Sequence, residues 1–186
     1  DATSWPLATM VSFTNHCYVN VDFSRNWDIA ASIDDPDTAC SRSGFIMSFV
    51  GCCPIFWTSK LQTTIVLSTT EAEYITLSNA LRDVIPMVSL LKEMKEYDIE
   101  HEGDQPTIHC KVFEDNSGAL TLATKHQWHP RTKHINSIQY HHFQSAVNDG
   151  SVKIYPIEST AQLAEMLTKP LALELLLKHC SFLMGW

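Results

Sequence analysis

The sequence lacks an uncharged apolar run of about eighteen residues, the length that a helix needs to cross a bilayer. Its first residues, DATSWPLATMVSF, also lack the basic segment and the cleavage site of a signal peptide. We therefore expect a soluble intracellular protein, cytoplasmic or nuclear, with no membrane partner and no secretion. The chain begins without Met, so we expect it to be a piece of a longer protein.

Cysteine is too sparse and too unevenly placed to build a disulfide framework. The chain has six cysteines in 186 residues, and two of them, Cys52 and Cys53, are adjacent. Small secreted scaffolds carry denser and more regularly spaced cysteines, so reduced thiols are expected here. The adjacent pair has no basic neighbour and no helix start beside it, so we assign it no redox function.

Positive charge is also in deficit. The chain has 13 Lys and Arg against 21 Asp and Glu, which gives a formal net charge of −8 at pH 7. This balance excludes a protein that holds nucleic acid through a general positive field. It leaves room for local basic contacts, or for metal ions that supply the positive charge.

The periodicity of the apolar residues predicts one α/β domain with a mixed five-stranded sheet. The first strand, at 17–23, places Tyr18, Asn20 and Asp22 on one side and apolar residues on the other. Three strands precede a long helix, and two more return through helical crossovers, so an antiparallel meander is followed by parallel strands. The other expected elements are a hairpin at 44–50 and 54–60, a helix at 67–97 kinked near Pro86, a strand at 107–115, helices at 118–125 and 140–150, a strand at 151–156, and helices at 159–169 and 171–184.

Acidic and amide side chains recur at the ends of these elements. In an open sheet, ligands gather at the carboxyl ends of the parallel strands, where such side chains could converge. Carboxylates that gather need cations, and oxygen ligands suit Mg²⁺ or Mn²⁺. Two such ions about 4 Å apart are a standard device for hydrolysing a phosphodiester. The side chains in question are Asn20, Asp22, Glu71, Glu73, Asp115 and Glu165.

Each of these acids also has a purely structural explanation. Thr70 and Glu73 have the spacing of a capping box, and Glu71 complements the helix dipole. Asp115 can cap the next helix, and Glu165 can lie on a solvated helix face. Spacing alone leaves both explanations open.

Five blocks follow one another along the chain, SKLQTTIVLSTTEAEY, KVFEDNSGALTLA, PRTKHI, YHHF and LTKPL. In this order they resemble the ribonuclease H domain at the C-terminal end of copia-type LTR retrotransposon polyproteins. The likeness covers residues 17–186 and leaves 1–16 as an N-terminal linker or extension. It implies a ribonuclease H-like fold that cuts the RNA strand of RNA:DNA hybrids with two Mg²⁺ or Mn²⁺ ions. It also implies a reverse transcriptase domain in the same polyprotein and a location in a cytoplasmic virus-like particle or the nucleus.

The resemblance implies four catalytic metal-binding positions, and two of them depart from the family pattern. Glu73 and Asp115 match the family's acids, and Glu165 matches an Asp. The Asp of the first strand matches Asn20, which we take as a degenerate catalytic position. Asp22 is an alternative ligand on the same face, but it lies about 6–7 Å further along the strand. We therefore expect cleavage to be impaired, and an inactive domain with a binding or structural role is the alternative.

Basic and histidine residues supply further candidates. Arg131, Lys133 and Lys125, and also Lys169, could hold the phosphates of a hybrid, although ordinary solvated charges explain each of them as well. The histidine-rich segment at 126–142 suggests a zinc site as one hypothesis. The spacing of its histidines instead favours polar loop and helix-surface positions. Trp57 and Trp128 are expected to be core or packing residues instead of platforms on which bases stack.

Overall fold

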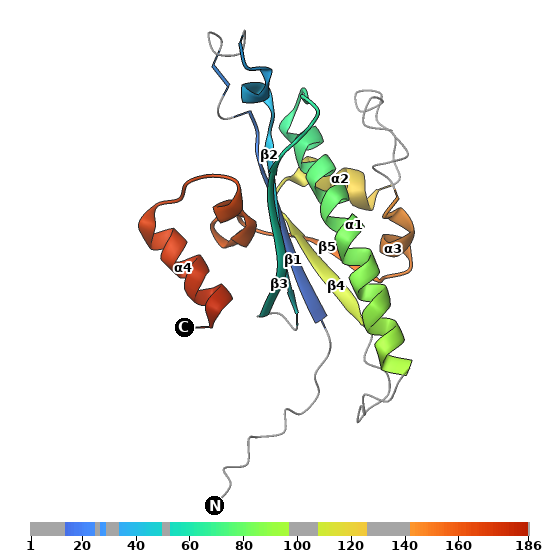
Figure 1. Cartoon of the computed structure of the whole chain (residues 1–186). Coiled ribbons are helices and arrows are strands. Elements are labelled where there is room, and N and C mark those ends of the chain that lie inside the picture. Colours follow the sequence, from blue (N-terminus) through green and yellow to red (C-terminus); the bar gives the residue numbers. More distant parts are fainter. Residues whose placement is uncertain are drawn as a thin grey trace, which may run out of the picture.

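In the computed structural model, the residues described are 14–24, 27–28, 34–49, 53–96, 108–125 and 142–185. Five strands form one sheet in the order β3-β2-β1-β4-β5 (Figure 1). β1 pairs antiparallel with β2, which pairs antiparallel with β3, whereas β1 with β4 and β4 with β5 are parallel. The strands are β1 (Thr14–Asp22), β2 (Arg42–Phe49), β3 (Cys53–Leu61), β4 (His109–Glu114) and β5 (Val152–Pro156). The predicted mixed five-stranded sheet is therefore confirmed.

Helices cover both faces of the sheet (Figure 1). On one side lie α1 (Thr69–Glu96), α2 (Ser117–Thr124) and α3 (Gln144–Asn148). On the other lie the 3-10 turn η6 (Leu163–Leu167) and α4 (Leu173–Met184), while short 3-10 turns η2 (Pro36–Ala39) and η5 (Ser159–Ala161) sit in connections. Among the residues described, no helix is both long enough and apolar enough to span a membrane.

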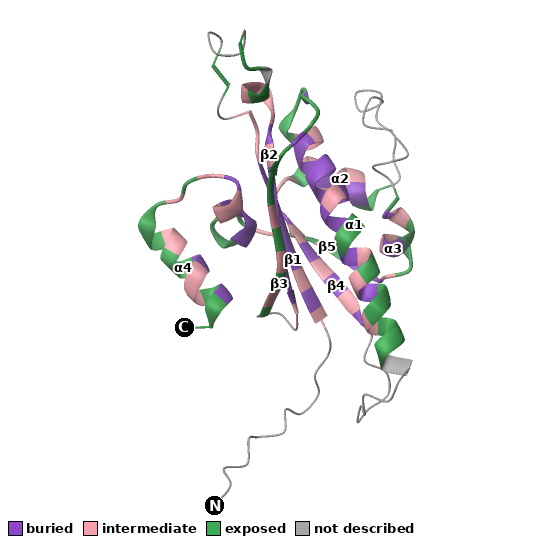
Figure 2. Ribbon diagram, in the orientation of Figure 1, coloured by how far each residue is buried: buried purple, intermediate pink, exposed green. Residues whose placement is uncertain are grey.

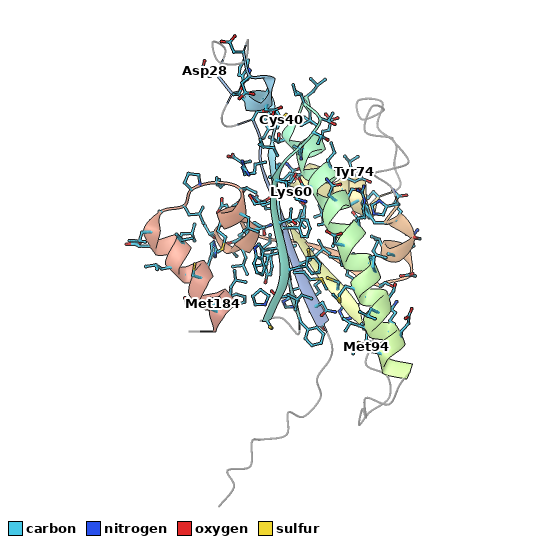
Figure 3. All side chains as sticks on the ribbon, in the orientation of Figure 1. Asp28, Cys40, Lys60, Tyr74, Met94 and Met184 are labelled. Atoms are coloured by element: carbon cyan, nitrogen blue, oxygen red, sulfur yellow. The ribbon has the colours of Figure 1, made fainter. Side chains whose placement is uncertain are left out.

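The main core lies between α1 and the sheet, where Figure 2 shows buried residues concentrated. Alternation along β1 turns Cys17 and Val19 toward α1, and both are fully buried there. Tyr74 extends from α1 toward the α3 side (Figure 3) and contacts Phe143, with ring centroids 5.7 Å apart. This core fixes the N-terminal turns of α1 against the centre of the sheet.

A second, smaller core lies under η6 and α4 on the opposite face. Tyr18 of β1 stacks on Phe113 of β4, with ring centroids 4.9 Å apart and ring planes at 22°. Leu163, Ala164 and Leu183 pack against this pair from η6 and α4. Successive residues of β1 and β4 therefore face different cores, which decides where their polar side chains can reach.

The first turn of α1 is capped by Ser68 and Glu71. The Ser68 hydroxyl accepts a hydrogen bond from the backbone of Glu71 at 3.2 Å, and the Glu71 carboxylate accepts one from the backbone of Leu67 at 3.0 Å. The capping box considered for Thr70 and Glu73 is therefore wrong. Glu73 is not used by the helix end and is available for other contacts.

The predicted helix at 159–169 is wrong. The segment forms two 3-10 turns, η5 and η6, which are separated by Gln162 with an extended backbone at φ −77° and ψ 98°. The reason is the fully buried side chain of Gln162, whose amide donates to the backbone oxygens of Val19 at 2.8 Å and Phe113 at 3.2 Å. These two hydrogen bonds join β1 to β4 where the last paired residues of their ladder lie.

Other predictions differ from the structure in smaller ways. The first strand begins at Thr14, and Pro86, near which a kink is predicted, lies inside the continuous helix α1. The helix expected at 140–150 is only the short α3, although Gly150 does end it with a positive φ of 78°. Trp57 is 62% exposed on the edge strand β3, so its assignment to the core is wrong. Cys52 and the Gly51 turn lie outside the described residues.

Candidate metal site

Glu73 lies near the start of α1 and faces the end of β1. Its side chain is only 5% exposed, and its carboxylate accepts a hydrogen bond from the backbone amide of Val21. The hydroxyl of Thr70, one turn earlier, bonds to the Asn116 side chain at 3.4 Å, which ties this end of α1 to the segment after β4. Glu73 is thereby held between two neighbouring parallel strands.

Glu114 and Asp115 come from the end of β4. Alternation turns Glu114 toward α1, where it is 1% exposed, and one of its oxygens, Oε1, accepts from the backbone of Asn116 at 3.0 Å. Asp115 follows the strand and is partly exposed, and its Oδ2 accepts from the hydroxyl of Ser159 at 2.9 Å. Two consecutive acids therefore reach the same end of the sheet as Glu73.

These three carboxylates form one group. Each offers a ligand oxygen, and these atoms all lie within 4.8 Å of one another in Glu73, Glu114 and Asp115. Two of the oxygens, Oε2 of Glu73 and Oε2 of Glu114, are buried and have no hydrogen-bond partner among the described residues. The group fits a divalent cation, because it supplies hard oxygen ligands and leaves buried acceptors without a donor.

The electrostatics of the group also favour a cation. Burial raises the pKa of Glu73 well above its ordinary value, with a further rise from Glu114 and Asp115, while Val21 and Lys169 oppose the shift. Burial likewise raises the pKa of Glu114 to about 8, against the hydrogen bond from Asn116. Burial is the main cause of both shifts, and neighbouring carboxylates add to it, so a positive charge between these acids would favour their charged forms.

Asn20 faces the opposite side of the sheet. Its side chain is 3% exposed and its amide donates to the hydroxyl of Thr168 at 2.6 Å. That hydroxyl in turn donates to the backbone oxygen of Glu165 at 3.1 Å. Gly44, the register partner of Asn20 on β2, allows this close approach, because a Cβ there would lie 2.6 Å from the Thr168 methyl carbon. Asn20 therefore fastens η6 to the sheet.

Glu165 lies in η6, and the negative charge of its side chain is neutralised by Lys169. It is 8% exposed and forms an ion pair with Lys169, four residues later. Burial lowers the pKa of His179 on α4, and the nearby charge of Glu165 opposes that shift. Lys169 also acts electrostatically on Glu73, so its ammonium group lies near both carboxylates.

Comparisons with known proteins bear on what this arrangement is. No protein-family model matches the chain. The chain is 31% identical over 172 residues to a retrovirus-related Pol polyprotein from transposon TNT 1-94 of Nicotiana tabacum, with 91% of the chain covered. It is 34% identical over 157 residues to each of the Pol polyproteins from transposons RE2 and RE1 of Arabidopsis thaliana, with 84% covered. It spans only 12%, 10% and 9% of these relatives.

The crystal structure of ribonuclease H1 from Halobacterium salinarum superposes on the chain with a TM-score of 0.50. The alignment covers 83% of this chain and 94% of that one, at 10% sequence identity, so it establishes the fold alone. The chain is a relative of copia-type transposon Pol polyproteins with a ribonuclease H-like fold. The resemblance inferred from the sequence blocks is thereby confirmed.

This ribonuclease H-like domain brings together only part of the predicted site. Glu73 and Asp115 lie in the carboxylate group, whereas Asn20 and Glu165 lie toward η6. Asp22 is the last residue of β1, two positions beyond Asn20 and partly exposed, with Arg42 as its register partner. Their roles as metal ligands stay predictions.

Glu114 is the member of the group that the sequence interpretation missed. The signal was present, because Ile108, Cys110, Val112 and Glu114 share one face of an alternating strand. An acid at the fourth inward position of such a strand has no ordinary structural reason, since buried charges need partners. The adjacent Asp115 matches the acid that the resemblance implies at the end of this strand, so the sequence interpretation assigned the metal ligand to Asp115 and not to Glu114.

The basic candidates are less well placed. Lys125 is exposed and caps the end of α2, while Arg131, Lys133, Trp128 and the histidine-rich stretch up to His141 lie outside the described residues. A hollow of about 470 Å³ between the end of β3 and α1 is lined by Lys60 (Figure 3), Gln62 and Arg82, among others. None of the three clustered carboxylates lines it, so this hollow is separate from the metal site.

Proposed function

We propose that the chain is the ribonuclease H domain of a retrotransposon Pol polyprotein, with residues 1–16 as a linker before it. Its substrate is the RNA strand of RNA:DNA hybrids, and an intact site of this kind uses two divalent ions to activate water and stabilise the leaving oxygen. A reverse transcriptase domain in the same polyprotein would supply the hybrid. The observation that carries the proposal is the gathering of Glu73, Glu114 and Asp115 at one end of a ribonuclease H-like sheet.

We propose further that this copy cleaves poorly or not at all. The resemblance implies a carboxylate at position 20 beside the ions, whereas this chain has a neutral amide there that faces η6. A unit charge pair at 4 Å is worth about 4 kcal/mol at an effective dielectric near 20. Even a discounted loss of this size lowers metal occupancy or rate by orders of magnitude. The hydrogen bond from Asn20 to Thr168 supports this, because it gives the amide a structural use.

The pairing of Glu165 with Lys169 favours a second candidate function, a domain that keeps the fold without the chemistry. Such a domain would bind a hybrid or a protein partner. The net charge of −8 makes local cations necessary for a hybrid, and Lys60, Arg82 and Lys125 are among the described residues that could supply them.

Hybrid cleavage in Mg²⁺ or Mn²⁺ separates these functions. We expect little or no cutting by the chain as it stands and a clear gain in the Asn20→Asp variant. Adding Asp115→Asn to that variant is the matched control and should abolish the gain. Strong cutting by the unchanged chain would refute the loss of activity, and a reverted variant that binds hybrid without cutting it would favour the binding domain.

A further inference from the structure

We propose that Glu114 is a metal ligand in this chain and that, together with Glu73 and Asp115, it holds one divalent cation of the Mg²⁺ or Mn²⁺ class. This proposal refines the site of the proposed nuclease, but it concerns cation binding and not cleavage. It differs from the four positions that the family resemblance implied, because Glu114 is not one of them.

The first argument is the spacing of the ligand atoms. Two oxygens that bind the same Mg²⁺ at about 2.1 Å can lie at most about 4.2 Å apart. The oxygens of Glu73, Glu114 and Asp115 lie within 4.8 Å of one another. Small rotations of three side chains would therefore bring them into contact with a common ion.

The second argument is independent of that spacing. Glu114 is 1% exposed and Glu73 is 5% exposed, yet Oε2 of each has no hydrogen-bond partner among the described residues. A buried acceptor without a donor is costly, and this group contains two of them. One cation between the two carboxylates would satisfy both acceptors at once.

The third argument limits the number of ions. Glu165 is paired with Lys169, whose positive charge also reaches Glu73, and Asn20 is neutral and bonded to Thr168. Three carboxylates can neutralise one dication, but two dications beside a lysine would leave an excess of positive charge. The site has no carboxylate from Asn20 on β1, and Glu114 on β4 supplies a negative charge in its place.

The competing explanation is that Glu73 and Glu114 share a proton and bind no metal. Glu114→Gln separates the two explanations, because glutamine keeps the shape and a hydrogen-bonding group but removes the charge. Calorimetric titration of the metal-free protein with Mn²⁺ alone should give one site, with affinity weaker by at least about tenfold in Glu114→Gln. Glu114→Asp, which keeps the charge, should lie between the two.

Glu93→Gln is the matched control, since Glu93 is exposed on the same helix as Glu73, five turns or more away. It should bind Mn²⁺ as the unchanged chain does. A folded Glu114→Gln protein with unchanged Mn²⁺ affinity would overturn the proposal, and so would a stoichiometry of two ions.

A measurement on the unchanged chain covers the case in which Glu114→Gln does not fold. Substoichiometric Mn²⁺ should broaden the backbone amide signals of Asn116 and Val21, which bond to Glu114 and Glu73, before those of α4. Broadening centred elsewhere would overturn the proposal. Because no nucleic acid is present in this titration, one-site binding would leave this inference standing even if the Asn20→Asp variant failed to cleave hybrid, which would reject the nuclease. Cleavage that survives in Glu114→Gln with full Mn²⁺ affinity would do the reverse.

Discussion

At the scale of single residues, the structure explains how an asparagine fits at position 20, where the resemblance implies a carboxylate. The amide of Asn20 donates to Thr168, which a carboxylate cannot do, and Thr168 already donates to the backbone oxygen of Glu165. The surroundings of residue 20 on the η6 side therefore suit an amide side chain. The amide carries no charge and adds a buried hydrogen bond between β1 and the segment after η6.

Asn20→Asp should therefore lower stability in the absence of metal. We expect a loss of about 1–3 kcal/mol in the free energy of unfolding, because the amide donor disappears and a charge is buried. Mn²⁺ should restore part of this loss, since a carboxylate at position 20 gains from a nearby cation. Urea unfolding with EDTA and with Mn²⁺ measures both effects.

Thr168→Val is the control for the hydrogen bond alone. It should lower stability in both conditions without any recovery from Mn²⁺. An Asn20→Asp protein as stable as the unchanged chain in EDTA would contradict the structural use of the amide.

At the scale of elements, the segment 159–169 acts as a clamp across β1, β2 and β4. Gln162 bonds to the backbones of β1 and β4, and Thr168 packs on Gly44 of β2. These contacts override the helical pattern of the sequence, since they need an extended residue in its middle. The clamp holds the strand ends that carry Asn20 and the two acids after Phe113.

Gln162→Leu should loosen this clamp. Two buried hydrogen bonds to main-chain oxygens are lost, so we expect a loss of about 2–4 kcal/mol in the free energy of unfolding. Hydrogen exchange should increase at the C-terminal ends of β1 and β4 more than in β2 and β3. Equal increases across all strands would contradict a local role.

Gly44→Ala tests the other contact of the clamp. Its Cβ would lie 2.6 Å from the Thr168 methyl carbon and 3.0 Å from the Cβ of Leu167, so we expect a loss of about 1–3 kcal/mol in chemical denaturation. Adding Thr168→Ser removes the methyl group that clashes and should recover part of the loss. No recovery would mean that the strain arises elsewhere.

The sheet could be predicted because apolar and polar residues alternate clearly in the first strand and in the hairpin. The helical spacing of apolar residues over a long segment likewise predicted α1. It could not predict the two 3-10 turns, since their geometry depends on backbone oxygens of distant strands that Gln162 reaches. For the site, family blocks identified Glu73 and Asp115, but they could not identify Glu114, which is not a family position. Alternation along the strand is the sequence signal for Glu114, and its burial and unpartnered oxygen in the structure complete the identification.

At the scale of the whole molecule, the carboxylate group should set the pH dependence of stability without metal. Burial raises the pKa of Glu114 to about 8 from an ordinary value of 4.5, so its contribution to stability is fully present below pH 4.5. Between these values the native state holds a proton that the unfolded state has lost, so stability falls as pH rises and levels off above about 8. The raised pKa of Glu73 acts in the same direction.

Urea unfolding in EDTA from pH 5 to 9 should therefore show declining stability, and Glu114→Gln should show a smaller decline. Saturating Mn²⁺ should reverse the trend, because the deprotonated carboxylates bind the ion. A flat profile in EDTA would contradict the burial of two facing acids.

We infer that this ribonuclease H-like domain holds its cation through acids on α1 and β4 and not through the first strand. A crystal grown in Mn²⁺ and measured for anomalous scattering tests it most directly. We expect one manganese peak bonded to Glu73, Glu114 and Asp115, with none at Asn20. Two peaks that flank Asn20, or no peak beside Glu114 with the ion saturating, would contradict it.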